Sequence, residues 1–183
     1  MGLFLNGLPI VTMELKNQLT GQNVKHSENQ YRYDRDPKNE PLLQFKRCLV
    51  HFAVGNEKVS MTTHLQGNNT RFFPFNKDID NPINPNGHKS SYLWEDILQP
   101  DNLLDLIDNF IHQQETTDRV YDDKTQQVKL EKNQVLIFPR YHQLDVIRKI
   151  KSAVVNEGVG GNYLIQHTTG SGKSNSIAWL AHL

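Results

Sequence analysis

The chain of 183 residues has a single cysteine, Cys48, no net charge and no long apolar run. One cysteine excludes an internal disulfide and a multi-cysteine zinc site. A bilayer-spanning helix needs roughly 20 consecutive apolar residues, and no stretch approaches that length. Lysine plus arginine and aspartate plus glutamate both number 20, which argues against a small, wholly basic nucleic-acid module. We therefore expect a globular cytoplasmic protein without a membrane segment.

The first half of the chain carries the signals of a small mixed sheet. Asn6-Gly7 lies between two apolar stretches, and Asn-Gly is a strong two-residue hairpin turn because both positions tolerate positive φ. Polar residues then favour a short helix followed by a loop at Asp36-Pro37. We expect two hairpins and one helix, over residues 3–16, 49–63 and 23–35.

The second half is divided by a polar stretch. Residues 114–134 have almost no apolar content, which predicts a linker or an exposed strand pair. Apolar stripes at helical spacing flank it on both sides. We expect helices around 103–111 and 141–154, a short buried strand over 162–166, and a helix from about Lys173.

A glycine-rich loop over residues 167–174, His-Thr-Thr-Gly-Ser-Gly-Lys-Ser, follows the predicted strand. Gly170 and Gly172 would let backbone amides surround phosphate oxygens, and the positive end of the following helix would face the same point. Lys173 would reach the β- and γ-phosphates, and the Ser174 hydroxyl would bind Mg²⁺. The alternative is a glycine-rich turn that caps a helix. The predicted cofactors are ATP and Mg²⁺, held by Thr169, Gly170, Ser171, Gly172, Lys173 and Ser174.

Upstream of that loop, Phe-Pro-Arg-Tyr-His-Gln over residues 138–143 resembles the adenine-recognising Q motif of superfamily 2 helicases. The Gln143 amide can both donate to and accept from one adenine edge, and the plane of Arg140 can stack on the base. Taken alone, Gln143 could equally be a solvated helix residue. No Walker B acid or water-positioning residue follows Ser174 up to Leu183, so we expect this chain not to hydrolyse ATP.

Glu14 and Lys16 end the second strand of the predicted first hairpin. Because side chains alternate along a strand, both would project from one face, opposite Val11 and Met13. A carboxylate that binds Mg²⁺ beside an ammonium suits metal-dependent cleavage of phosphodiesters. The alternative is an exposed ion pair on a strand.

Other residues allow two interpretations each. The aromatic run Phe72-Phe73-Pro74-Phe75 suits either a stacking platform for bases or the edge of a core strand. The histidines are not at ligand spacing and are expected to be solvated or capping. Several cations could contact DNA phosphates or simply form a solvated face: Arg32, Arg35, Lys38, Lys46 and Arg47.

Three segments together resemble the restriction (R, motor) subunit of type I restriction-modification enzymes. They read LFLNGLPIVTMELKNQLTGQN, PLLQFKRCLVHFAVGNEKVSMTTHLQGNNTRFFPFNK, and FPRYHQLDVIRKI followed by NYLIQHTTGSGKSNSIAWLAHL. The resemblance implies an α/β fold in which a PD-(D/E)xK restriction-endonuclease-like mixed sheet with flanking helices precedes the first strand, phosphate loop and helix of a RecA-like helicase domain. The implied boundaries are a partial nuclease domain over 1–113, a linker over 114–134 and the start of the motor domain over 135–183.

By the same resemblance, Glu14 and Lys16 match the acid and lysine of the nuclease motif, with Glu14 as metal ligand. Gln30 matches the glutamine of a Gln-x-x-x-Tyr element, although Asp34 stands where the tyrosine is expected. The partner aspartate of the motif would precede Met1, so we expect a chain that is a fragment and does not cleave DNA alone.

The implied parent is an ATP-dependent site-specific deoxyribonuclease that translocates and cuts double-stranded DNA. Its partners would be DNA, a methyltransferase subunit and a specificity subunit. Two other functions remain open: a nucleotide- or DNA-binding remnant without chemistry, and a superfamily 2 helicase segment whose N-terminal region is only structural.

Overall fold

A five-stranded mixed sheet forms the centre of the computed structural model, which describes residues 1–123 and 125–183. Its strand order is β1-β2-β3-β4-β5, and β2 and β3 are parallel whereas the other neighbours are antiparallel. The strands are β1 Gly2–Leu5, β2 Leu8–Leu15, β3 Val50–Val54, β4 Val59–Thr62 and β5 Phe73–Pro74. The mixed α/β class expected from the sequence is therefore confirmed.

Both predicted hairpins are present in the sheet. Asn6 and Gly7 adopt φ values of 49° and 82° between β1 and β2, as a turn with two left-handed positions requires. The second hairpin joins β3 to β4 through Gly55, whose N–H bonds the carbonyl of Lys58 at 2.9 Å. The aromatic run ends at the sheet edge, where Phe73 lies in β5 and Phe75 is fully buried.

Because parallel strands need a crossover connection, the chain between β2 and β3 leaves the sheet and covers one of its faces. It forms α1 Val24–Asn29, which continues as a π-helical turn over Gln30–Asp34, as expected for residues 23–35. Short 3-10 turns precede and follow it over Gln18–Thr20 and Pro41–Leu43. Tyr31 and Leu43 pack there against Ala53 and Leu65.

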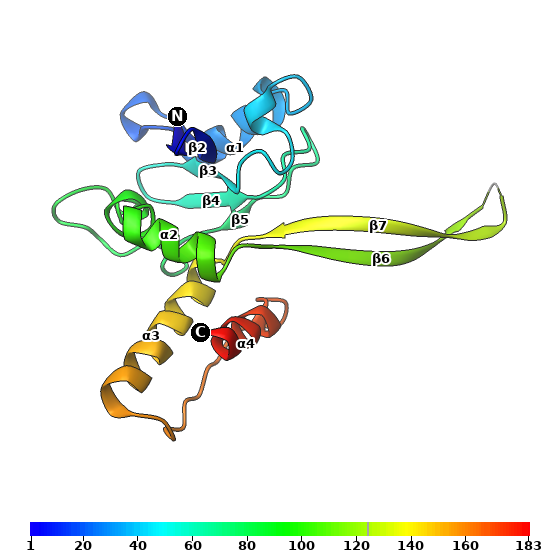
Figure 1. Ribbon diagram of the computed structural model, residues 1–183. Coiled ribbons are helices and arrows are strands. Elements are labelled where there is room, and N and C mark those ends of the chain that lie inside the picture. The colour runs from blue at the N-terminus through cyan, green and yellow to red at the C-terminus, as the bar shows by residue number, and fades with distance from the viewer. Residues whose placement is uncertain (124) are drawn as a thin grey trace.

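The opposite face of the sheet carries the larger core. Val11, Met13 and Phe52 point into it, and the π-helical turn Leu93–Ile97 and α2 Pro100–Asn109 cover it. Two further helices, α3 Tyr141–Glu157 and α4 Lys173–His182, pack on the same core. Figure 1 shows α1 and α2 on opposite sides of the strands. The domain boundaries expected from the sequence stay a prediction.

A long two-stranded ribbon extends away from this body (Figure 1). It pairs β6 His112–Asp122 with β7 Gln127–Ile137 in antiparallel register and contains no strand of the main sheet. It is the exposed strand pair that was one of the two alternatives for residues 114–134; Lys124 lies outside the described residues. In its outer half Tyr121 and Leu130 are 57% and 66% exposed, whereas Leu136 at its base is buried.

The prediction of a strand over residues 162–166 is wrong. These residues form an irregular segment, and Leu164 is 95% exposed. A strand needs a neighbouring strand to bond its backbone groups, and no strand among the described residues lies beside it. The helix after the loop is present as α4. No helix in the described part of the chain is long and apolar enough to cross a membrane.

Candidate functional site

Glu14 lies near the end of β2, on the face of the sheet that α1 covers. Its neighbour in the register is Ala53, which packs under Tyr31 and Leu43. The Oε1 atom of Glu14 accepts bonds from both Nε and Nη2 of Arg35, at 2.7 and 2.5 Å. Arg35 follows the π-helical turn, and its backbone N–H bonds the carbonyl of Gln30 at 3.1 Å. The hydrogen bond that Arg35 donates to Glu14 raises the pKa of Arg35, so the guanidinium stays charged at neutral pH.

A buried polar network lies next to this ion pair along the same face. The Thr12 hydroxyl is 2.8 Å from the Tyr31 hydroxyl and 2.6 Å from Nδ1 of His51. All three residues are less than a tenth exposed. Burial raises the pKa of Tyr31 and lowers the pKa of His51 to about 4, so at neutral pH both side chains are uncharged. The network fixes the strand on which Glu14 lies.

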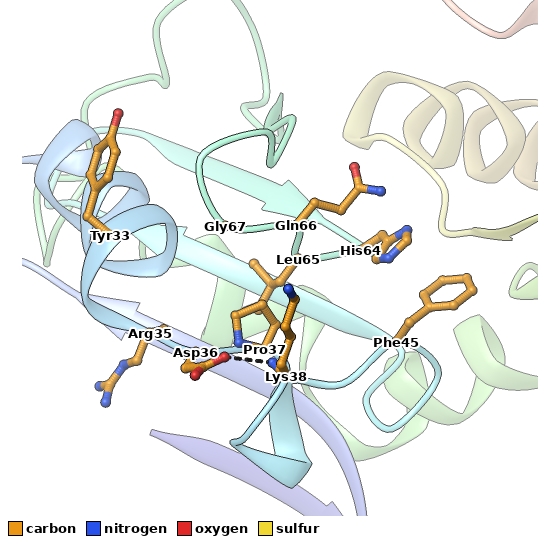
Figure 2. A pocket seen from close by; sticks show the side chains of 10 residues that line it. All are labelled: Tyr33, Arg35, Asp36, Pro37, Lys38, Phe45, His64, Leu65, Gln66 and Gly67. Atoms are coloured by element: carbon orange, nitrogen blue, oxygen red, sulfur yellow. Dashed lines mark hydrogen bonds between the residues drawn. The ribbon is translucent and has the colours of Figure 1, made fainter.

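A pocket of about 800 Å³ opens beside Arg35. Figure 2 shows Arg35 at one end, Lys38 in the middle, and Phe45 with His64 at the other end. The Phe45 and His64 rings stack with centroids 4.2 Å apart. The pocket is thus lined by Arg35, Lys38 and the Asp36 carboxylate together with two stacked flat rings.

Lys16 and Gln30, the other predicted nuclease residues, lie just after β2 and at the start of the π-helical turn. The backbone N–H of Lys16 bonds the carbonyl of Val54 at 2.9 Å, which continues the β2–β3 pairing to Lys16. Lys16 lies just beyond the end of β2, and a shared face with Glu14 stays a prediction. Gln30 lies where α1 passes into the π-helical turn, and its Oε1 is buried without a hydrogen-bond partner in the described residues.

The residues around Glu14 do not fit a Mg²⁺ site as they are arranged. Mg²⁺ prefers several oxygen ligands in near-octahedral geometry, whereas the Glu14 carboxylate is already bonded to a guanidinium. Across residues 1–123 and 125–183, no three histidine, cysteine, aspartate or glutamate side chains gather as a metal site would need. Glu14 is a counter-ion for Arg35 in this arrangement.

The predicted phosphate loop lies on the other side of the core, in front of α4. Gly170 and Gly172 have φ values of 75° and 83°, conformations that favour glycine. The Lys173 ammonium donates to the carbonyls of His167 and Thr168 at 3.2 and 3.0 Å. Lys173 and Ser174 are exposed, and the Ser171 hydroxyl is buried without a partner in the part of the chain described.

The Q-motif residues contact this loop directly. Nε2 of Gln143 donates to the carbonyl of Gly172 at 2.8 Å, while its Oε1 accepts the backbone N–H of Arg140 at 2.9 Å and so caps α3. Nε2 of His142 is 3.0 Å from the carbonyl of Ser171. A side chain at position 172 would place its Cβ 2.5 Å from the Gln143 amide. The Arg140 guanidinium lies 4.4 Å over the Phe73 ring, and burial lowers its pKa.

The loop residues fit a nucleotide phosphate. Among the described residues, the backbone N–H groups of Gly172, Lys173 and Ser174 have no acceptor, so they form an unsatisfied cluster of donors at the start of a ten-residue helix. Helix N-termini of this kind bind phosphate oxygens. The exposed Lys173 and Ser174 side chains supply a cation and a hydroxyl at the same place.

Sequence reasoning did not predict the hydrogen-bond partners of the candidate residues, whose roles stay predictions. Arg35 was one of several cations that suited either DNA or solvent, and nothing local marks it as the partner of Glu14. His51 and Thr12 gave no signal, because their pairing depends on the parallel register of β2 and β3. The Phe45–His64 stack also joins residues from separate loops.

Comparison with known proteins gives one family. Residues 1–70 match the family model described as type I restriction enzyme R protein N terminus (HSDR_N). No curated protein and no solved structure is significantly similar to the chain. The matched segment contains Glu14, Lys16, Gln30 and Arg35, together with the Phe45–His64 end of the pocket. The similarity to the N terminus of type I restriction enzyme R proteins therefore covers residues 1–70 of the 183-residue chain.

Proposed function

We propose that this chain is part of the R subunit of a type I restriction enzyme, which in its complete form translocates double-stranded DNA with ATP and cleaves it. The observation that carries the proposal is the family match over residues 1–70, which contain the predicted nuclease strand. The implied partners are DNA and the methyltransferase and specificity subunits. The N-terminal part would be a PD-(D/E)xK-type nuclease domain, with residues 135–183 as the beginning of a RecA-like motor domain.

The proposed nucleotide site consists of the loop before α4 and the Q-motif residues. Gln143 and Arg140 would bind the adenine, and Thr169, Gly170, Ser171, Gly172, Lys173 and Ser174 would bind the triphosphate. Mg²⁺ held by Ser174 would screen the charge of the phosphates. The contact from Gln143 to the Gly172 carbonyl supports this proposal because it brings the two motifs to one place. In the free chain that same carbonyl occupies one of the two hydrogen-bonding sides of the Gln143 amide.

In the proposed nuclease site, Glu14, Lys16 and Gln30 keep the roles implied by the family, namely acid, lysine and positioning glutamine. The Glu14–Arg35 ion pair means that the acid is not free in this arrangement. We therefore propose that the chain alone does not cleave DNA. The ion pair favours a second candidate for the isolated chain, which is nucleotide or DNA binding without chemistry.

The experiment that tests the nucleotide site is Lys173→Ala. Removing the ammonium is expected to weaken binding of a fluorescent ATP analogue with Mg²⁺ at least tenfold, because a charge-assisted contact to phosphate is worth about 1.5–3 kcal/mol. Fluorescence anisotropy of the 183-residue chain measures the dissociation constant. Lys151→Ala, in an exposed part of α3, is the matched control and is expected to bind as the wild type does. Equal affinity of the Lys173 and Lys151 variants would contradict the assignment.

A further inference from the structure

The ribbon β6–β7, which extends away from the body of the protein (Figure 1), has two strand edges that no further strand covers. Its sheet consists of β6 and β7 alone among the strands of the described residues. Nine of the eleven residues of β6 are exposed and none is buried. An isolated two-stranded ribbon is only marginally stable in water, whereas three or more strands that share an apolar face can be stable by themselves. The ribbon therefore offers backbone donors and acceptors to a further strand.

The backbone of β6 lacks the features that usually keep an edge strand from pairing. Proteins protect such edges with short strands, prolines and bulges. β6 contains neither proline nor glycine, and its register with β7 runs without a bulge from His112 to Asp122. Charged side chains are the remaining protection of an edge strand, and their positions decide which strand can lie beside it.

The charges of β6 make this strand complementary to an antiparallel copy of itself. Thr117 is the middle residue of β6, so a copy that meets it at Thr117 pairs over the complete strand. This register places Glu115 opposite Arg119 of the second copy and, by two-fold symmetry, Arg119 opposite Glu115. Directly opposed charges of unlike sign stabilise a sheet, and like charges destabilise it. The other pairs contain no like charges: His112 with Asp122, Gln113 with Tyr121, Gln114 with Val120 and Thr116 with Asp118.

Neighbouring registers and the other edge of the ribbon are less favourable. Moving the centre to Asp118 or Arg119 would oppose that charged residue with itself, and moving it to Thr116 would oppose no unlike charges. In β7, the same full-length pairing would oppose its middle residue, Lys132, with Lys132 of the second copy. The charge pattern therefore favours the edge of β6 and the register centred on Thr117.

The two charged side chains of this register are available to a second copy. Arg119 is exposed and has no ion pair or hydrogen bond in the part of the chain that the structure describes. One oxygen of Glu115, Oε1, accepts a bond from Nε2 of Gln134, and Oε2 has no donor among the described residues. Glu115 and Arg119 of one ribbon lie roughly 13 Å apart along the strand, and they form no ion pair with each other.

We propose that β6 pairs with β6 of a second copy of this chain, antiparallel about Thr117, so that two ribbons form a four-stranded sheet with the β6 strands at its centre. The contact uses the same surface on both copies and therefore closes at a dimer. Directly opposed residues share a face, so Tyr121, Val128 and Leu130, each more than half exposed, lie on one face of the ribbon. In the dimer, this face of the sheet contains both sets. The inference goes beyond the proposed function and depends on neither the nucleotide site nor the nuclease site.

A charge exchange between positions 115 and 119 tests the pairing. Sedimentation velocity of the 183-residue chain over a wide range of concentrations is expected to show a monomer–dimer equilibrium. Arg119→Glu and Glu115→Arg each place like charges opposite each other in two symmetric pairs, so each is expected to raise the dissociation constant of the dimer about tenfold. The double variant restores both pairs with their charges exchanged and is expected to return to within about threefold of the wild type. Because the two residues of one ribbon do not reach each other, such a recovery requires a second copy.

Matched variants on the other strand control for net charge. Lys132→Glu and Glu131→Arg change the charge by the same amounts at exposed positions of β7 and are expected to leave the dimer as stable as in the wild type. The proposal is overturned if the wild-type chain stays monomeric at all concentrations, if the double variant does not recover, or if the β7 variants weaken the dimer as much as the β6 variants do. Circular dichroism confirms that each variant is folded.

A disulfide at the two-fold axis tests the register without any change of charge. Thr117→Cys places two thiols directly opposite each other, and the roughly 4.5–5.5 Å between opposed Cα atoms of antiparallel strands suits a disulfide. Cys48, the only native cysteine, is fully buried. With oxidised glutathione, Thr117→Cys is expected to form a covalent dimer on a non-reducing gel, whereas Asn133→Cys, on β7, is not. Absence of the Thr117→Cys dimer, or equal cross-linking of both variants, would overturn the proposal even if a charge variant fails to fold.

Discussion

Replacing Trp179 with alanine is expected to lower the free energy of unfolding by about 3–5 kcal/mol, the usual cost of removing a large buried aromatic side chain. Trp179, on α4, is only 4% exposed. Its ring packs 5.7 Å from that of Phe110, and its Nε1 donates to the Phe110 carbonyl at 3.0 Å. The substitution would leave a cavity and an unpaired carbonyl between α4 and the end of α2. Urea denaturation followed by circular dichroism measures the loss.

The other tryptophan of the chain provides the control. Trp94 is 42% exposed, so Trp94→Ala is expected to change the stability by less than about 1 kcal/mol. A large difference between the two variants would show that α4 unfolds together with the sheet. Similar values for both would mean that residues after the ribbon do not contribute to the common core, and that α4 packs only loosely.

Acidification is expected to destabilise the protein through His51. The pKa of this side chain falls from 6.5 to about 4 in the folded state because it is buried. Between these pH values His51 is protonated in the unfolded chain but not in the folded chain. The free energy of unfolding therefore falls as the pH falls from about 6.5 to about 4. At about 1.4 kcal/mol per pH unit, the loss approaches roughly 3 kcal/mol. The loss is complete once the pH lies below the folded-state pKa.

The variant that isolates this effect is His51→Gln, whose amide can still bond to Thr12 but does not titrate. Its stability at pH 7 is expected to be lower than that of the wild type, but it should lose about 3 kcal/mol less between pH 7 and pH 4. Urea denaturation at a series of pH values gives this difference directly. His88→Gln, at an exposed position, serves as control and is expected to retain the full acid loss. Identical pH profiles for wild type and His51→Gln would contradict the assignment.

The elements that the sequence predicted well are those whose signals are local. Asn6-Gly7 determines its hairpin through two positive φ values, and the helical spacing over residues 103–111 predicts a helix that the structure places at Pro100–Asn109. Residues 162–166 show the limit of such reasoning. Their apolar composition suits a strand, but whether a strand forms depends on a neighbour to bond with, and that information lies elsewhere in the chain.

In the candidate site, too, local patterns predict some features, whereas others depend on how distant parts of the chain pack together. Strand alternation predicts that Glu14 and Lys16 share a face; the backbone pairing with β3 continues to Lys16, and the shared face stays a prediction. Alternation could not reveal that Arg35, 21 residues away, reaches Glu14, because that contact depends on how the crossover between β2 and β3 packs on the sheet. The Gln143–Gly172 contact likewise joins two motifs 29 residues apart. Motifs predict the candidate residues, whereas the packing determines which of their atoms already have hydrogen-bond partners.

The length of the β6–β7 ribbon can be changed by deletions that leave the body of the protein unaltered. It meets the body at its base, where Leu136 is buried and Lys46 bonds to Gln134. Excising Thr117-Asp118 together with their partners Glu131-Lys132 would shorten the arm by one pleat and leave every outer side chain on its original face. Excising one residue from each strand would exchange the two faces. Variants whose ribbons differ in length but whose body is unchanged could therefore be made from this one chain.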